Sequence, residues 1–309
     1  MVDASEVAAA LSRHMPSVLR WCGALAKSLR GHNIALSGKH TGSANTDALT
    51  LADLTIQELI VAALRDADPV LRACRIEAEE STGDLMRFAR EGELVLAIDP
   101  IDGTKQYRDR TGNGYAVMLH LRNRETVLYS LVFVPECGPN GAWVEVHDGR
   151  IVTGPDNCGR PARGLLDSLR PVKRDQLPES KKIYLIGFQR LDPERASDLS
   201  SVGLDGHTSE TMAGSIYELM ARGEYAGSLI HSPNVYDFPV SLHLARALGG
   251  DAVWVHNREP VKFGETWLDE RANMIRLPGI VACSPWRATL DRLCELARDW
   301  NPVRYPPET

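Results

Sequence analysis

The feature that most constrains this chain is a short apolar segment that ends in two closely spaced carboxylates. Residues 94–98 read Leu-Val-Leu-Ala-Ile, and Asp99 follows them directly, with Asp102 three positions later. A short apolar run of this kind is typical of a buried strand. Ligands of α/β proteins commonly bind beyond the carboxyl ends of the strands. We therefore expect a buried strand, stopped by Pro100, that carries both carboxylates into a ligand site.

The residues after Asp102 fit a phosphate site, and they also fit a turn. Gly103 lets the backbone come close to a ligand, and Thr104 is a favourable residue for capping the start of a helix. The free N–H groups at a helix start suit an anion such as phosphate. Asp-Pro and Asp-Gly pairs, however, are also common in plain turns. This segment alone leaves both interpretations open.

Further acidic residues become informative only when they are taken together. Glu79 lies in an acidic run, Asp53 follows the start of a helical pattern, and Asp237 precedes another. Each alone is typical of a solvated face or of a helix start, where an acid is favourable. Two carboxylates about 4 Å apart repel by roughly 4 kcal/mol at an effective dielectric constant of about 20. Hard divalent cations offset such repulsion, and all-oxygen ligands favour Mg²⁺, Mn²⁺ or Ca²⁺ over zinc.

Composition argues against several other classes of protein. The chain has 309 residues, 41 acidic and 35 basic, so its formal charge of −6 disfavours binding to a nucleic acid polymer. A hydrophobic content of 43% argues against disorder. No apolar run reaches the roughly 18 residues of a membrane span, and the N-terminus lacks signal-peptide features. Six cysteines without metal-type spacing are consistent with a cytoplasmic enzyme that lacks zinc and disulfides.

Helical and strand patterns alternate along the chain, which indicates an α/β or layered α+β fold. The patterns predict helices at 7–29, 51–64, 214–221 and 240–248, and strands at 94–98, 115–121, 127–134, 183–187 and 252–255. The polar segment 31–47 is expected to be a loop. The stretch 154–182, rich in Gly, Pro and Arg, is expected to join an N-terminal lobe, 1–165, to a C-terminal lobe, 166–309, within one functional unit.

Four motifs, in this order, resemble those of the inositol monophosphatase superfamily of metal-dependent, lithium-sensitive phosphatases. They are Thr50 to Asp53, Glu79-Glu80-Ser81, Asp99-Pro-Ile-Asp-Gly-Thr104, and Tyr236-Asp237 before a helix that ends in Gly249-Gly250. The resemblance covers residues 45–255, and the hexapeptide is its most specific part. It implies a layered αβαβα sandwich, often a homodimer, with the active site between the lobes.

The resemblance also implies roles for the residues at matching positions. The implied metal ligands are Glu79, Asp99, Asp102, Asp237 and the carbonyl of Ile101. The implied catalytic residues are Asp53, Thr104 and Glu79, with Thr104 hydrogen-bonded to Asp53 and orienting the attacking water. The implied phosphate-binding residues are Gly103, Thr104, Lys105, Ala213, Gly214 and Ser215. The implied cofactor is Mg²⁺, at two or three ions per site, with Mn²⁺ as a substitute.

The substrate is less well specified than the chemistry. Asp-Gly-Thr-Lys-Gln-Tyr at 102–107 is more similar to the 3′(2′),5′-bisphosphate nucleotidases than to the inositol enzymes. Ile216, however, stands where those nucleotidases carry Lys, and Tyr236 stands where Trp is expected. Inositol enzymes contact the inositol ring with an acidic residue. The corresponding position falls near Ile230, so this contact is missing here.

We therefore expect hydrolysis of a small phosphorylated metabolite, with adenosine 3′,5′-bisphosphate as the first candidate and AMP and phosphate as its products. An inositol phosphate or another sugar phosphate is the alternative. A catalytically silent homologue that only binds phosphate or metal would be expected to lack Asp53, Thr104 or a metal carboxylate, and this chain retains all of them. Neither a membrane nor a nucleic acid polymer is expected as a partner.

Overall fold

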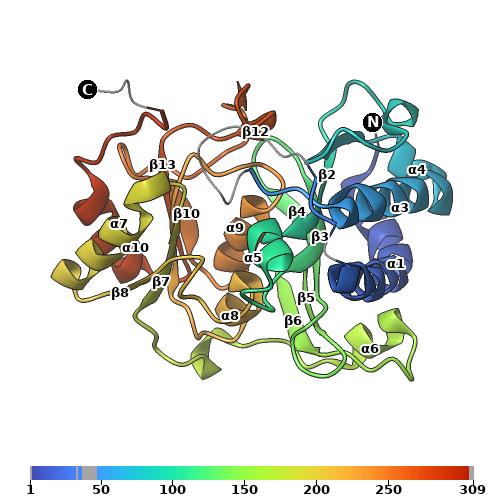
Figure 1. Ribbon diagram of the computed structural model, residues 1–309, viewed down its shortest axis with the longest axis horizontal. Helices are drawn as coiled ribbons and strands as arrows, with labels where there is room; N and C mark the ends of the chain where they lie inside the picture. Colours follow the sequence, from blue (N-terminus) through green and yellow to red (C-terminus); the bar gives the residue numbers. More distant parts are fainter. Residues whose placement is uncertain (1, 33, 37–46, 306–309) are drawn as a thin grey trace.

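The computed structural model describes residues 2–32, 34–36 and 47–305, and its helices and strands form five layers (Figure 1). The helices are α1 (Ala4–His32), α3 (Leu51–Ala67), α4 (Pro69–Arg72), α5 (Thr104–Asp109), α6 (Ala162–Ser168), α7 (Asp192–Asp198), α8 (Ile216–Ala221), α9 (Phe238–Ala247) and α10 (Arg287–Ala297). The strands are β1 (Arg75–Ala78), β2 (Val95–Asp102), β3 (Ala116–Arg122), β4 (Val127–Val134), β5 (Ala142–His147), β6 (Arg150–Pro155), β7 (Lys182–Ile186), β8 (Asp205–His207), β9 (Gly227–His231), β10 (Asp251–Trp254), β11 (Trp267–Asp269), β12 (Met274–Arg276) and β13 (Ile280–Ser284).

The first sheet has the strand order β1-β2-β3-β4-β5-β6, with β1 parallel to β2 and every other pair antiparallel. Helices α1 and α3 cover one of its faces. Apolar side chains recur along α1 at helical spacing, and Leu11, Met15 and Leu19 are fully buried against this sheet. Helices α8 and α9 pack on the opposite face, where Met118 and Val132 share a core with them.

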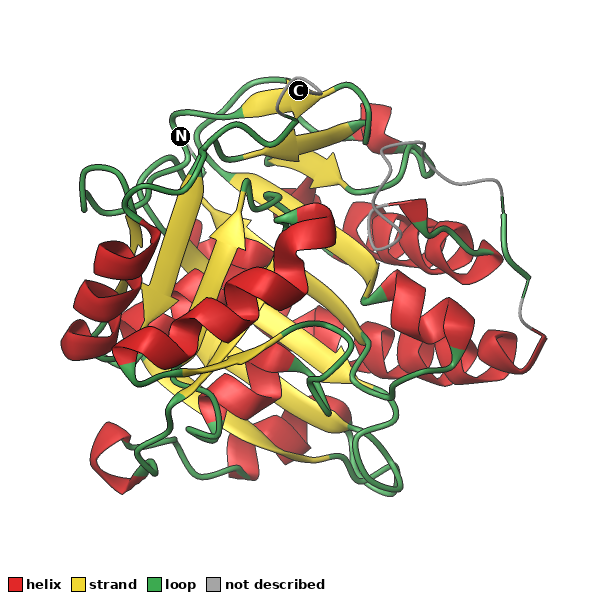
Figure 2. Cartoon of the chain, turned by 60° about the vertical axis from the view of Figure 1, so that its left-hand side comes forward, coloured by secondary structure: helices red, strands yellow, loops and turns green. Residues whose placement is uncertain are grey.

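The second sheet has the order β10-β13-β9-β7-β8, and α8 and α9 lie between the two sheets. Helices α7 and α10 cover its outer face, where Leu290 and Leu293 are buried against Leu229 and Ala282. The succession of helix and strand layers is also visible in Figure 2. The expected layered αβαβα fold is therefore confirmed, and its middle helical layer belongs to the C-terminal half of the chain.

One local prediction is wrong where the site begins. The strand predicted at 94–98 is β2, and it does not stop at Pro100 but runs on to Asp102. Proline has no N–H to donate to a neighbouring strand, and the pairing of β2 with β3 shifts register between Asp99 and Asp102. The irregularity keeps the strand in the sheet while changing the direction of its last side chains.

The other sequence predictions agree with the structure, fall outside the described residues or stay untested. The strand predicted at 127–134 is β4, with the same bounds. Positions 33 and 37–46 of the predicted loop lie outside the described residues. The proposed boundary at 165 falls within α6, with the first sheet before it and the second after it, and the division into two lobes stays a prediction. In the described part of the chain, no helix combines the length and the apolar character needed to cross a membrane.

Candidate metal centre

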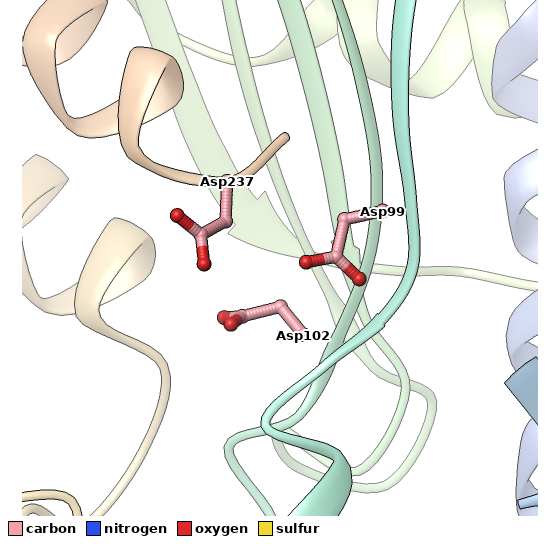
Figure 3. A group of neighbouring side chains, drawn as sticks. All are labelled: Asp99, Asp102 and Asp237. Atoms are coloured by element: carbon pink, nitrogen blue, oxygen red, sulfur yellow. The ribbon is translucent and has the colours of Figure 1, made fainter. Parts of the chain in front are cut away.

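Three aspartates converge at the junction of the first sheet and the middle helical layer (Figure 3). Asp99 and Asp102 come from the end of β2, and Asp237 comes from the start of α9. One carboxylate oxygen of each lies within 4.8 Å of those of the other two. The fold therefore brings together residues from both halves of the sequence.

Asp237 does not cap α9 with its side chain, as the sequence also allowed, and Asn234 holds it in place instead. Asp237 occupies the N-cap position of α9 but makes no side-chain capping hydrogen bond. Asn234 Oδ1 accepts hydrogen bonds from the backbone N–H groups of Tyr236 and Asp237, at 2.8 and 3.0 Å. Asn234 Nδ2 donates to Asp237 Oδ2 at 2.9 Å. This loop holds the Asp237 carboxylate beside the other two aspartates.

The electrostatics of the cluster require added positive charge. Burial raises the pKa of Asp99 well above its usual range, and the charges of Glu79, Asp102 and Asp237 add to this. Burial also raises the pKa of Asp102 to about 6, against a hydrogen bond from Tyr217 that lowers it. Burial and the Asp102 charge raise the pKa of Asp237 to about 7. At neutral pH the three groups therefore cannot all ionise at low cost.

The cluster fits hard divalent cations. Asp99 is 2% exposed, and its Oδ1 has no hydrogen-bond partner among the described residues. A buried carboxylate oxygen without a partner is costly unless something else satisfies it. The candidate metal-ligating atoms here are carboxylate and carbonyl oxygens, which suit Mg²⁺. The residues present therefore meet the requirements of a Mg²⁺ site.

Glu79 joins the same cavity from the end of β1. Its backbone N–H donates to the carbonyl of Ile98 at 3.2 Å, and its carboxylate helps to raise the pKa of Asp99. Gln57 on α3, fully buried, fixes the segment that follows: its Nε2 donates to the Glu80 carbonyl at 2.5 Å, and its Oε1 accepts the Glu80 N–H at 2.9 Å. Sequence reasoning missed Gln57, because a polar residue within a helical pattern gives no sign of its partners.

Asp53 and Thr104 are hydrogen-bonded in the way that the family motifs implied. Thr104 Oγ1 lies 3.1 Å from Asp53 Oδ1 and 2.7 Å from the carbonyl oxygen of Ile101. Its single proton can serve only one of these acceptors at a time. The other Asp53 oxygen accepts from the Thr50 N–H and hydroxyl groups at 2.7 and 2.6 Å. Burial nevertheless raises the pKa of Asp53 to about 7, so this group can gain or lose a proton near neutral pH.

The predicted phosphate-binding residues are only partly brought together. Gly103, with φ of 83°, is the N-cap of α5, and Thr104 is the first helical residue rather than the cap. Gly103, Thr104, Lys105 and Gly214 line the cavity beside the aspartates. Ala213 and Ser215 lie outside this lining. The reason is local, because Gly214 has φ of 119° and Ser215 begins α8 with its hydroxyl buried.

The cavity has a volume of about 360 Å³ and extends from the aspartates toward the second sheet. Lys105, beside the aspartates, pairs with Glu210 at 3.1 Å, and the lining toward the second sheet includes Asp192 and Arg304. Arg304 Nη1 donates to the carbonyls of Gly187 and His231 at 3.3 and 2.9 Å. A cavity of this size fits a small metabolite, and its two ends differ, since one is acidic and the other mixed in charge.

Comparison with known proteins places this geometry in a family. The model of the inositol monophosphatase family matches residues 14–300. The class 1 fructose-1,6-bisphosphatase of Methylobacterium radiotolerans is 33% identical over 102 residues, which are 33% of this chain and 26% of that protein. The chain thus matches about a quarter of the length of this relative.

Solved structures share the fold at low sequence identity. CysQ from Bacteroides thetaiotaomicron, a bacterial member of the inositol monophosphatase family, has a TM-score of 0.59 and 18% identity, covering 92% of this chain and 98% of that one. An IMPase/NADP phosphatase complexed with Mg²⁺ and phosphate has a TM-score of 0.60 and 12% identity, covering 92% and 97%. Likeness at this level of identity supports the architecture alone.

Proposed function

The chain belongs to the inositol monophosphatase family, and we propose that it is a phosphatase that uses its aspartate cluster to hydrolyse a small phosphorylated metabolite. Members of this family are metal-dependent phosphatases, so the chain is a hydrolase of phosphoric monoesters. The observation that carries the assignment of the site is the convergence of Asp99, Asp102 and Asp237 around a buried carboxylate oxygen that has no partner among the described residues.

The proposed metal ligands are the three aspartates, Glu79 and the Ile101 carbonyl. A fold neighbour that holds Mg²⁺ together with phosphate supports Mg²⁺ as the ion, and two or three ions with Mn²⁺ as a substitute are proposed from the family. When bound, such ions lower the pKa of water and stabilise the negative charge of a transferring phosphoryl group.

The remaining groups of the site orient the reactants. We assign Thr104 and Asp53 to the attacking water, because the Thr104 hydroxyl lies at the cavity wall and its partner Asp53 can hold a proton near neutral pH. The N–H groups of Gly103 and Thr104 are assigned to the phosphate oxygens. Hydrogen-bond donors fixed in advance around a developing charge are among the strongest contributions to catalysis.

The substrate proposed first is adenosine 3′,5′-bisphosphate. Lys105 lines the cavity one residue after Thr104, so its ammonium group can reach a second phosphate on the same substrate. The second candidate is a phosphorylated polyol or sugar. It is favoured by the ion pair in which Glu210 neutralises Lys105, and by Asp192, whose carboxylate suits hydroxyl groups.

A panel of substrates separates these candidates. Phosphate release is measured from adenosine 3′,5′-bisphosphate, 3′-AMP, inositol 1-phosphate and fructose 1,6-bisphosphate, each with Mg²⁺ and with EDTA. Lys105→Met is expected to lower kcat/KM for the bisphosphate about 10- to 100-fold and to leave kcat/KM for 3′-AMP unchanged, because a charge-assisted hydrogen bond contributes roughly 1.5–3 kcal/mol. Turnover that continues in EDTA would refute the whole assignment. Equal effects of Lys105→Met on both nucleotides would refute the nucleotidase proposal.

Three further properties are proposed. A homodimer and inhibition by lithium are proposed from the family, and a cytoplasmic location from the cysteine pattern. Inhibition is supported by a fold neighbour, the staphylococcal inositol monophosphatase-1, whose structure is an inhibitory complex soaked in LiCl. The mass of the particle in solution tests the homodimer, and a lithium titration of phosphate release tests the inhibition.

A further inference from the structure

The segment that carries the proposed water-orienting and phosphate-binding groups has little to hold it in place by itself. Helix α5 is six residues long and lies between two left-handed residues, Gly103 with φ of 83° and Arg110 with φ of 55°. A helix of this length is unstable unless tertiary contacts support it. Its first residue, Thr104, must nevertheless stay within hydrogen-bond distance of Asp53.

Arg30, near the end of α1, contacts this segment with its whole guanidinium group. Its Nε donates to the Tyr107 carbonyl at 3.0 Å, and its Nη2 donates to the carbonyls of Gln106 and Gly112 at 3.2 and 2.7 Å. Its Nη1 donates to Asn113 Oδ1 at 3.0 Å and to a Glu136 carboxylate oxygen. All five guanidinium N–H groups therefore have partners.

The surroundings of Arg30 make this contact rigid. The residue is 7% exposed, and its guanidinium lies 5.7 and 5.1 Å from the ring centres of Tyr107 and Tyr115. Arg110 returns the contact, because its Nη2 donates to the carbonyls of Arg30 and Gly31 at 2.9 and 3.0 Å. The end of α1 and the end of α5 are thus bonded to each other in both directions.

Arg30 itself does not line the cavity, whereas Thr104, Lys105, Gln106 and Gly112 do. We propose that Arg30 is the positioning residue of the reaction, which fixes the segment 104–113 so that Thr104 stays aligned with Asp53. This proposal rests on the function proposed above for Thr104. The proposed metal ligands lie on β2, just after β1 and just before α9, and Arg30 contacts none of these elements through its side chain, so its loss should leave the affinity for Mg²⁺ unchanged.

The test uses Arg30→Lys in the full chain, since lysine keeps the charge but cannot reproduce the planar fork of donors. The matched control is Arg163→Lys. Arg163 likewise makes several bonds, to Glu145, Asp167 and Ser12, but on α6, away from the cavity. If folding fails in Arg30→Lys, Asn113→Ala removes one of the five partners and serves in its place.

Arg30→Lys is expected to lower kcat 10- to 100-fold, the loss typical of a misplaced catalytic group. The Mg²⁺ affinity by calorimetry should stay within twofold of the wild type. In the Thr104→Ala background, Arg30→Lys should lower kcat less than threefold, because the hydroxyl group that Arg30 positions is then absent. Arg163→Lys should keep full activity. Equal losses in the Thr104 and Thr104→Ala backgrounds would overturn the proposal.

Hydrogen exchange tests the same proposal without activity. In Arg30→Lys the amides of 104–113 should exchange at least tenfold faster than in the wild type, and in Arg163→Lys they should not change. Unchanged exchange in this segment would refute the positioning role. If the wild type lacks phosphatase activity altogether, the proposed function fails, while this measurement still decides whether Arg30 holds the segment.

Discussion

Replacing Asp237 by asparagine should stabilise the protein when no metal is present. Asp237 is partly buried among other acids, and this loss of solvent raises its pKa from 3.8 to about 7. The folded state therefore holds a proton that the unfolded chain has already released. A group with a raised carboxyl pKa destabilises the folded state above the pKa of the unfolded chain, and the penalty is complete above the folded pKa.

The size of the effect follows from the shift. Three pKa units at about 1.4 kcal/mol each give a penalty of roughly 4 kcal/mol at pH 8. At pH 5 the same relation leaves about 2 kcal/mol, because the cost of keeping the folded carboxyl group protonated grows with the distance of the pH above the unfolded pKa, which is then only about one unit. Asparagine has no charge to remove, and its amide oxygen can still accept the hydrogen bond from Asn234. Asp237→Asn should therefore be more stable than the wild type by these amounts.

The assay is urea unfolding in EDTA at pH 5 and at pH 8. Asp148→Asn is the control, because the Asp148 side chain is 89% exposed and its loss should change the free energy of unfolding by less than 0.5 kcal/mol at both pH values. With saturating Mg²⁺ the order should reverse, since the wild type gains binding energy that the variant lacks. The reasoning is refuted if Asp237→Asn is no more stable than the wild type in EDTA at pH 8.

Three other changes test separate parts of the account. Glu210→Gln should raise kcat/KM for adenosine 3′,5′-bisphosphate about two- to fivefold, because exposed ion pairs such as Lys105–Glu210 are worth up to about 1 kcal/mol. The value of kcat/KM for 3′-AMP should not change. A lower kcat/KM for the bisphosphate would contradict this prediction. Asp53→Asn should lower kcat 10²- to 10⁴-fold, as expected for a group that takes part in proton transfer. It should also remove any kinetic pKa near 7 from the pH–rate profile. An unchanged profile would exclude Asp53 from proton transfer. Gly114→Ala should destabilise the fold and weaken substrate binding, because its Cβ would lie 2.1 Å from the Gly214 carbonyl oxygen; wild-type thermal stability and KM would show that this close approach is not needed.

Local sequence predicted the parts of the site that depend on neighbouring residues. The apolar run before Asp99 and the spacing to Asp102 are properties of one strand and its end, so the pattern alone places both carboxylates. The irregular pairing that carries β2 past Pro100 depends on β3, which the local pattern does not describe.

Contacts between distant segments could not be read from the sequence. Gln57 reaches the Glu80 backbone, and Arg30 reaches α5 and the residues after it, only because separate helices pack beside the first sheet. In the sequence Gln57 is a polar residue of a predicted helix and Arg30 lies just past the end of another, and polar residues of these types are usually exposed. Asn234 had a local signal, since an Asn three residues before a helix-starting Asp is typical of a turn, but its effect on the Asp237 carboxylate requires coordinates.

The central claim is that the carboxylate cluster holds the metal that the reaction needs. The most direct test is the rate of phosphate release from adenosine 3′,5′-bisphosphate and inositol 1-phosphate, by the wild type and by Asp99→Asn, as Mg²⁺ is titrated from EDTA to saturation. The wild type should gain activity with Mg²⁺ on at least one substrate, and Asp99→Asn, folded by circular dichroism, should lose at least 99% of it, a loss of about 2.7 kcal/mol in transition-state stabilisation. Undiminished Mg²⁺-dependent turnover in Asp99→Asn would contradict the account.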